Sequence, residues 1–265
     1  MPELPEVEMR RRLMESYAVG RCIRRATVSD PAMLDGVSTE EVAGALGGQV
    51  VTETHRHGKW LFVGVASGRW LVLHFGMTGG LAAHETGQAL PRFTRLSLAL
   101  DDGQSVTFVD PRKFGGATLT VDVEGFLRAR RWGPDPTAPG FGLAEFRAVL
   151  AGRTGNLKGI LLNQKVIAGI GNLYADEMLY QAGLHPETRA ADLTPATVAR
   201  LYDGMMRAFE ASLAVGTRYE QLPESFLLHH RNRTCQCPRC GATLKIHRVA
   251  GRSTHYCPRH QRKRR

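Results

Sequence analysis

Three cysteines and a histidine near the C-terminus of this 265-residue chain have the spacing of metal ligands. Cys237 and Cys240 form a CxxC pair, Cys257 and His260 form a CxxH pair, and sixteen residues separate the two pairs. Each pair can close a tight turn that directs two ligands at one ion, and tetrahedral zinc favours such a ligand set. We therefore expect one structural zinc ion, because so short a segment cannot build a core of its own. Cys235 is the alternative to His260 as the fourth ligand.

The segment that holds these ligands is strongly basic. From residue 229 to residue 265 there are eleven Lys and Arg and no Asp or Glu, while the rest of the chain is close to neutral. The basic residues are Arg231, Arg233, Arg239, Lys245, Arg248, Arg252, Arg259, Arg262, Lys263, Arg264 and Arg265. Such a surface binds phosphate by releasing counterions, so we expect a nucleic acid as the partner, ahead of an anionic membrane or a solvated tail.

The elements that must position this segment change character along the chain. A helix is predicted over residues 5–17, and strand-like runs follow at 22–28, 49–54, 60–65, 70–75, 96–100, 105–109 and 117–120. A stretch rich in Gly and Pro at 133–140 has the composition of a linker, and helical patterns follow at 143–150, 156–163, 173–182 and 195–213. Two short strands at 243–249 and 252–256 predict a β-hairpin between the metal-ligand pairs.

These patterns predict an α+β protein of three parts. We expect an N-terminal β-sandwich domain with an N-terminal helix at 1–132, a helical domain at 133–228 and a zinc-bound β-hairpin finger at 229–265. The proportions of 43% hydrophobic and 23% charged residues are those of a globular protein. No run of eighteen apolar residues occurs and the chain starts with a polar, acidic segment, so we expect a cytoplasmic protein with no membrane partner.

A glycine-rich turn joins two of the predicted helices, at residues 165–172. Asn172 is expected to cap the second of these helices, so free backbone N–H groups and the helix dipole would meet at the turn. Both favour negative charge, so the turn is suited to binding a phosphate.

Several motifs in one order resemble a known family. They are MPELPEVE at residues 1–8, Gly58-Lys59, His74-Phe-Gly-Met77, Asp110-Pro-Arg112-Lys-Phe114-Gly, the helix-two-turn-helix (H2TH) around Asn172 and the terminal finger. The chain is similar, nearly end to end, to the formamidopyrimidine-DNA glycosylases of the Fpg/Nei superfamily. This resemblance implies a bifunctional DNA glycosylase and AP lyase of base excision repair that removes oxidised purines and nicks the strand by β,δ-elimination.

The resemblance assigns catalytic roles to four residues. Removal of Met1 leaves Pro2 as a secondary amine, whose reference pKa of about 7.7–8.0 makes it easier to neutralise than lysine at about 10.4. Pro2 would attack the sugar C1′ and form an iminium adduct (a Schiff base), and Glu3 would serve as general acid. Lys59 would contact phosphate and assist β-elimination, and Arg252 would grip phosphates beside the lesion and support δ-elimination.

The resemblance also implies how damaged double-stranded DNA is held. The target base must leave the stack, and an apolar wedge with an arginine suits that task. Phe114 would wedge, Met77 would fill the gap, and Arg112 would bond to the orphaned base. His74 and Asn172 match further phosphate contacts. We expect a monomer that works on the nucleoid.

The chain departs from the family pattern at three places. His260 stands where the fourth zinc ligand is usually a cysteine. Phe93-Thr-Arg95 stands where the formamidopyrimidine branch commonly has histidines, so Arg95 is expected to replace one DNA contact. Only twenty residues lie between Gly216 and Cys237, fewer than this branch spends on the loop that covers an everted 8-oxoguanine.

The short loop leaves the substrate open. Leu4, Met77, Arg112 and Phe114 favour the branch that acts on oxidised purines, whereas the loop resembles the branch that acts on oxidised pyrimidines. The same chemistry on oxidised pyrimidines is therefore the nearest alternative. Two alternatives of other classes are a non-catalytic zinc-finger protein that binds damage and an RNA-binding finger protein.

Overall fold

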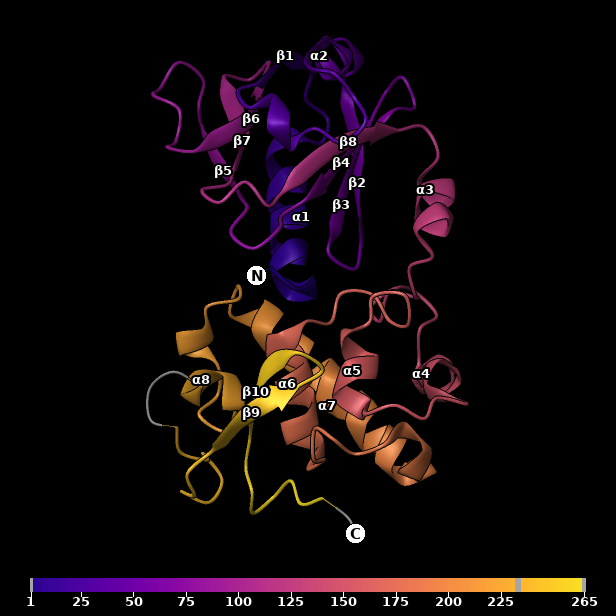
Figure 1. The fold of residues 1–265 in the computed structure, drawn as a ribbon. Helices are drawn as coiled ribbons and strands as arrows, with labels where there is room; N and C mark the ends of the chain where they lie inside the picture. The colour runs from indigo at the N-terminus through magenta and orange to yellow at the C-terminus, as the bar shows by residue number, and fades with distance from the viewer. Residues whose placement is uncertain (1, 232–234, 264–265) are drawn as a thin grey trace. The chain divides into compact units, whose positions relative to one another are not determined.

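The computed structural model describes residues 2–231 and 235–263. Met1, whose removal is predicted, and the basic residues Arg233, Arg264 and Arg265 lie outside the described residues. The chain divides into two compact units (Figure 1). The first unit comprises Met1–Pro2 and Glu6–Arg131, and the second comprises Glu3–Pro5 and Trp132–Arg265. Among the described residues, no helix combines the length and the apolar character needed to span a bilayer.

Two four-stranded antiparallel sheets build the first unit (Figure 1). One sheet has the order β1-β6-β7-β5, from strands Ile23–Val28, Thr94–Leu100, Gln104–Val109 and Gly80–Glu85. The other has the order β2-β3-β4-β8, from strands Val51–His57, Trp60–Val65, Trp70–His74 and Gly116–Thr120. Their inward side chains join one core, to which Val63 and Leu71 contribute from one sheet and Leu98 and Val106 from the other. The predicted β-sandwich is confirmed.

Helix α1 (Leu4–Ala18) closes this core through Val7 and Met14. Helices α2 (Thr39–Leu46) and α3 (Val123–Arg130) and the 3₁₀ turn η1 (Pro31–Met33) complete the unit. Strand β5 has no counterpart among the predicted strands, because its sequence GLAAHE has no β-branched or aromatic residue. The segment is a strand because it pairs with β7, from Gly80 opposite Val109 to Glu85 opposite Gln104.

Helices build most of the second unit. They are α4 (Leu143–Leu150), α5 (Leu157–Leu162), α6 (Asn172–Ala182), α7 (Pro195–Ala214) and α8 (Leu227–His230), with 3₁₀ turns η2 (Ala190–Asp192) and η3 (Tyr219–Gln221). Helices α5 and α6 with the turn between them form the predicted helix-two-turn-helix. The long helix α7 packs its apolar face, including Leu201, Met205 and Phe209, into the core it shares with α6.

The finger hairpin consists of β9 (Lys245–Val249) and β10 (Arg252–Tyr256), which pair in antiparallel register. Its own apolar core is small: Leu244, Cys237 and Cys257 cluster with Tyr180 of α6 and Leu227 of α8. A core of this size leaves most of the folding energy to the metal, as the sequence predicts. The predicted finger is thus confirmed.

A buried carboxyl group in the second core gives a pH-dependent prediction. Glu177 of α6 is fully buried, and burial raises the pKa of its carboxyl to about 7. A carboxyl whose pKa is higher in the folded than in the unfolded state contributes stability at low pH and loses it as the pH rises through the folded pKa. We expect the free energy of unfolding of the second unit to fall by roughly 2–3 kcal/mol between pH 5 and pH 8, measured by urea titration.

Substitution of Glu177 separates this effect from the other titrating groups. Glu177→Gln cannot titrate, so its unfolding free energy should change less over the same pH interval. Glu210→Gln, at an exposed position of α7, is the matched control and should keep the wild-type slope. Equal slopes for Glu177→Gln and the wild type would contradict the assignment.

Candidate functional site

Glu3 is held at the N-terminus of helix α6. Its side chain is 1% exposed, and its carboxylate accepts hydrogen bonds from the backbone N–H groups of Gly171 (2.8 Å), Leu173 (2.8 Å) and Tyr174 (3.2 Å). The helix begins after Gly171, which has no side chain to cap it, so Glu3 serves as the cap and Asn172 does not. The three donors and the helix dipole all stabilise the negative charge of the carboxylate.

Glycines make this approach possible. A Cβ atom on Gly171 would lie 2.3 Å from the carboxyl carbon of Glu3, and one on Gly169 would lie 2.7 Å from Leu4. Gly169 also has a φ of +89° and accepts the N–H of Leu4 at 3.0 Å. The glycine-rich turn therefore receives the segment that directly follows Pro2 in the chain.

The two predicted phosphate contacts of the second unit lie close together. The side-chain amide of Asn172, the first residue of α6, donates to the carbonyl of Ser253 at 2.9 Å, and Ser253 follows Arg252 in β10. Arg252 is exposed. The bond therefore ties the start of α6 to the part of the finger that presents Arg252.

The same helix and hairpin also share a buried charge cluster, which sequence reasoning missed. The carboxylate of Asp176 accepts Lys158 Nζ at 2.6 Å, Arg231 Nη1 at 2.8 Å and the backbone N–H of His255 at 2.9 Å. Lys158 also donates to Thr254 Oγ1 at 2.6 Å. Asp176 thus connects α5, α6, the residue after α8 and the hairpin. These residues are far apart in the sequence, and no local pattern links them.

The four predicted metal ligands form one cluster. One ligand atom from each of Cys237, Cys240, Cys257 and His260 lies within 4.8 Å of all the others. The sulfurs of Cys240 and Cys257 are 3.7 Å apart, close to the edge of about 3.8 Å expected for a tetrahedron with Zn–S bonds of about 2.3 Å. The residues therefore fit one structural zinc ion, and His260 rather than Cys235 is the fourth member.

In the first unit, Lys59 and His74 belong to neighbouring strand ends. Lys59 lies in the tight turn between β2 and β3, and Trp60 pairs with His74 across β3 and β4. Burial lowers the pKa of His74, and the charge of Lys59 lowers it further. The neutral imidazole accepts the N–H of Gly76 at Nδ1 (3.3 Å), so the proton is assigned to Nε2, where it can be donated to a phosphate.

Met77, Arg112 and Phe114 are exposed residues on two loops that one carboxylate joins. Met77 is 44% exposed and Phe114 is 53% exposed, and the Arg112 guanidinium lies 4.9 Å from the centre of the Phe114 ring. The side chain of Asp110 accepts the hydroxyl of Thr78 at 2.6 Å and the N–H of Gly115 at 2.7 Å. Asp110 thereby holds both loops in one arrangement. Asp110 directly precedes Pro-Arg112 in the sequence, but no local pattern indicates that it joins this loop to the one of Met77.

Gly76 brings these two loops into contact and gives a prediction. Its φ is +54°, and a Cβ atom there would lie 2.3 Å from the carbonyl carbon of Phe114. We expect Gly76→Ala to cost about 1–2 kcal/mol for the backbone alone, more for the collision, and to weaken binding to lesion-containing duplexes. Gly87→Ala is the control, because its φ is +96° and nothing lies within 4 Å of its added Cβ. Equal thermal stability and DNA affinity for the two variants would contradict the contact.

Arg95 is engaged within the first unit. Its guanidinium donates to the carbonyl of Asp110 at 2.9 Å and to the carboxylate of Asp30 at 3.0 Å, and its side chain is 13% exposed. Asp30 also binds Lys113 at 2.9 Å. This arrangement supports the loop of Arg112 and Phe114 directly, whereas a DNA contact by Arg95 stays a prediction.

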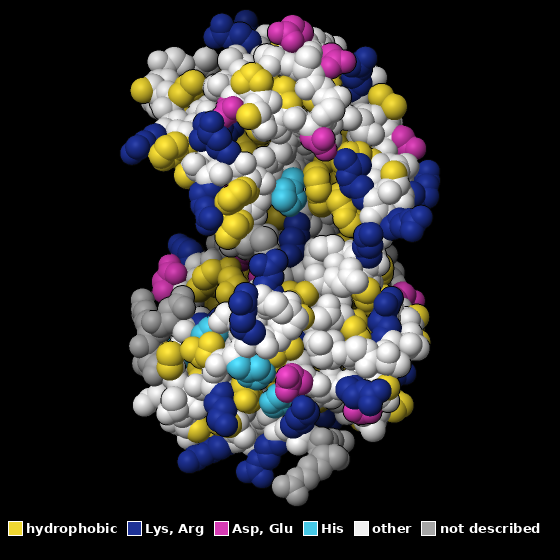
Figure 2. Space-filling model, in the orientation of Figure 1, with side chains coloured by type: hydrophobic (Ala, Val, Ile, Leu, Met, Phe, Trp, Pro, Cys, Tyr) yellow, Lys and Arg dark blue, Asp and Glu magenta, His cyan; other side chains and the backbone are white. Residues whose placement is uncertain are grey.

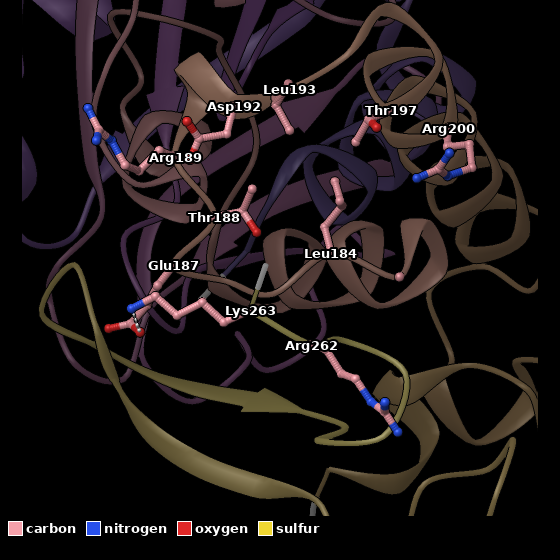
Figure 3. A pocket seen from close by; sticks show the side chains of 11 residues that line it. Leu184, Glu187, Thr188, Arg189, Asp192, Leu193, Thr197, Arg200, Arg262 and Lys263 are labelled. Carbon is pink, nitrogen blue, oxygen red and sulfur yellow. Dashed lines mark hydrogen bonds and ion pairs between the residues drawn. The ribbon is translucent and has the colours of Figure 1, made fainter. Parts of the chain in front are cut away.

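A pocket in the second unit is lined by none of the predicted site residues (Figure 3). Its lining carries both signs of charge, including Arg189, Arg200, Asp192 and an ion pair of Lys263 with Glu187 at 3.3 Å. The face in Figure 2 shows that Lys and Arg clearly outnumber acidic side chains on the second unit.

The matches to known proteins cover almost the whole chain. Family models match residues 1–117 (Formamidopyrimidine-DNA glycosylase N-terminal domain), 132–222 (Formamidopyrimidine-DNA glycosylase H2TH domain) and 236–259 (Zinc finger found in FPG and IleRS). A formamidopyrimidine-DNA glycosylase from Roseiflexus sp. (strain RS-1) is 38% identical over 99% of this chain and 100% of its own length. The chain belongs to the formamidopyrimidine-DNA glycosylase family.

Further relatives agree with this assignment. The enzyme of that name from Enterococcus faecalis is 35% identical over 98% of this chain and 97% of its own. The structure of the Lactococcus lactis enzyme, non-covalently bound to DNA containing an AP site, superposes with a TM-score of 0.87 at 29% identity, covering 98% of this chain and 100% of that one. The protein is therefore a DNA repair glycosylase of the formamidopyrimidine-DNA glycosylase type, with an FPG-type finger that takes one structural zinc.

Proposed function

We propose that this glycosylase is bifunctional: it removes oxidised purines through a Schiff base on Pro2 and then cleaves the strand at the abasic site by β,δ-elimination. The observation that carries the proposal is the anchored carboxylate of Glu3, which directly follows Pro2 and receives three backbone N–H groups at the start of α6. A buried, oriented carboxylate beside a terminal secondary amine has the groups needed for attack on C1′ and for the accompanying proton transfers.

The surroundings of Glu3 suggest the order of the proton transfers. The N–H groups stabilise the carboxylate, so the resting residue is an acceptor and not yet the acid expected from sequence. An α-amine with a pKa of about 7.7–8.0 is largely protonated at neutral pH. Glu3 first takes the proton of the Pro2 ammonium and then returns it to the opening sugar or the leaving base. Bonding of the Pro2 nitrogen to C1′ breaks the bond from C1′ to the base, which leaves with a proton. Breakage of the C1′–O4′ bond, with transfer of the remaining N–H proton to O4′ through Glu3, then opens the sugar and leaves an iminium ion.

The iminium ion makes strand cleavage possible. It withdraws electrons from C2′, whose proton can then be lost while the 3′ phosphate leaves, and a second elimination releases the 5′ phosphate. Lys59 assists the first step as a phosphate contact, and Arg252 assists the second. The neutral His74 beside Lys59 and the bond from Asn172 to Ser253 beside Arg252 support these roles as parts of two phosphate sites.

The exposed loops of the first unit support a role in extruding the base. Phe114 would enter the stack, Met77 would fill the gap, and Arg112 would donate to the unpaired base opposite. The exposure of Met77 and Phe114 and the attachment of both loops to Asp110 favour a preformed wedge over core packing. Arg95 would then act on DNA mainly through the loop that it supports.

The relatives and the length of the loop before the finger point to different lesions. Solved relatives are described as complexes with FAPY-dG containing DNA at a TM-score of 0.86 and with carbocyclic 8-oxo-G containing DNA at a TM-score of 0.87. They support oxidised purines as the substrate. The segment of only twenty residues between Gly216 and Cys237 favours the second candidate, oxidised pyrimidines.

A lesion panel separates the two candidates. Matched duplexes containing formamidopyrimidine, 8-oxoguanine or thymine glycol are incubated with the enzyme, and base release is measured separately from strand cleavage. We expect excision of both purine lesions, with formamidopyrimidine processed at least as fast as 8-oxoguanine, because the short segment before the finger leaves little chain to cover an everted 8-oxoguanine. Activity confined to thymine glycol would reverse the substrate assignment while leaving the reaction type intact.

The remaining parts of the proposal concern organisation. We propose that 1–132 is the catalytic domain, 133–228 the H2TH domain and 229–265 the finger, and that the protein acts as a monomer on damaged double-stranded DNA. A location in the cytoplasm, on the nucleoid, follows from that substrate.

A further inference from the structure

Tyr180 of helix α6 reaches the metal centre from outside the finger. Its side chain is fully buried in the small apolar cluster with Leu227, Leu244, Cys237 and Cys257. Its hydroxyl oxygen lies 3.2 Å from the sulfur of Cys237. A buried hydroxyl needs a partner, and this sulfur supplies one.

The direction of this hydrogen bond follows from the metal. A zinc-bound cysteine is a thiolate and has no proton to donate, so the Tyr180 hydroxyl must be the donor. Three thiolates and one neutral imidazole give a Zn²⁺ centre a net charge of −1. A donor aimed at one sulfur disperses part of this charge and holds that ligand in its orientation.

Arg239, which lies between the first two ligands, fixes the tyrosine ring. Its guanidinium stacks 4.4 Å from the ring centre, and it donates to the carbonyl of Tyr180 at 3.3 Å and to the side chain of Gln181 at 2.7 Å. The exposed arginine thus covers the ring from the solvent side. The finger and α6 hold each other at this point.

The tyrosine is the second of two attachments on one face of α6. Asp176, four residues earlier, accepts the N–H of His255 at 2.9 Å, two residues before Cys257. Positions four apart in a helix share a face. In successive turns of α6, Asp176 therefore holds the strand that leads into Cys257, and Tyr180 contacts Cys237 directly. We propose that the Tyr180 hydroxyl donates a hydrogen bond to the zinc-bound thiolate of Cys237, which slows zinc loss and attaches the metal centre to helix α6.

The test is zinc retention in Tyr180→Phe, a change that removes only the hydroxyl. Purified zinc-loaded full-length protein is mixed with a colorimetric zinc chelator, and zinc transfer is followed at several chelator concentrations. We expect zinc affinity to fall about 10-fold or more, the usual effect of removing a partner of a metal ligand. In cobalt-substituted protein, the thiolate-to-cobalt charge-transfer band should also shift, because one sulfur loses a hydrogen bond.

Tyr174→Phe is the matched control. Tyr174 lies on the same helix, is fully buried, and its hydroxyl bonds to Ser212 at 2.5 Å, away from the metal ligands. This variant should retain zinc within about twofold of the wild type and keep the cobalt spectrum. Equal zinc affinity and an unchanged cobalt spectrum in Tyr180→Phe would overturn the proposal.

Arg239→Gln provides a test that leaves the buried hydroxyl in place. Loss of the stacked guanidinium should speed zinc transfer by a smaller factor than Tyr180→Phe does. A Tyr180→Phe protein that folds only in excess zinc would support the proposal, because added metal would then replace the lost bond. If Tyr180→Phe fails to fold even in excess zinc, unchanged zinc transfer in Arg239→Gln overturns the proposal and faster transfer supports it.

Discussion

Glu3→Gln is expected to reduce base excision by about 10²–10⁴-fold, because general acid–base catalysis by a positioned side chain contributes that much. The glutamine cannot take the Pro2 proton or return it to the sugar. On DNA with a preformed abasic site the loss should be smaller, since no base has to leave. Single-turnover assays on a formamidopyrimidine duplex and on an abasic duplex measure the two steps separately.

The same substitution also disturbs the helix cap, and this effect must be measured separately. An amide –NH₂ at the position of one carboxylate oxygen would face the N–H groups of Gly171 or Leu173, which should cost about 1 kcal/mol of stability. Urea unfolding determines this cost, and Glu15→Gln, on the exposed part of α1, is the control for both assays. Excision within about threefold of wild type in a folded Glu3→Gln protein would contradict the proposed role.

Asp176→Asn is expected to destabilise the second unit by about 3–5 kcal/mol, because it leaves the ammonium of Lys158 and the guanidinium of Arg231 buried without their counter-charge. Lys158 is fully buried and Arg231 is 7% exposed, so water cannot replace the carboxylate. Burial lowers the pKa of Lys158, which the Asp176 carboxylate opposes. Denaturant unfolding followed by far-UV circular dichroism measures the change.

A matched control is available on the surface of the same unit. Glu187 pairs with Lys263 at 3.3 Å, and both side chains are more than one third exposed. Exposed pairs contribute little, so Glu187→Gln should unfold close to the wild type. If Asp176→Asn also unfolds close to the wild type, the buried cluster does not hold the hairpin on α6.

The metal centre is a part of the site that local sequence predicts. The CxxC and CxxH spacing predicts the ligand cluster and the hairpin because each pair lies within a single turn and the strands between them are consecutive. Most strands of the sandwich follow from alternating apolar residues in the same way. Strand β5 does not, because its pairing with β7 and not its composition places it in the sheet.

The parts of the site that join distant segments were beyond sequence reasoning. Gly171 and Asn172 predict a helix start, but its cap comes from Glu3, 168 positions earlier than Gly171. Asp176 gives no sign in the sequence that Lys158 and Arg231 will meet at its carboxylate. In each case a buried polar group finds its partner only after the core has brought remote elements together.

The central claim, a covalent intermediate on Pro2, is tested most directly by borohydride reduction of the enzyme on DNA that contains an abasic site. We expect the wild-type protein to give a stable protein–DNA complex whose cross-linked peptide begins with Pro2, and Pro2→Gly, with intact zinc and folding, to give a greatly reduced amount. No complex with the wild-type protein, or undiminished trapping through another residue in Pro2→Gly, would contradict the proline mechanism.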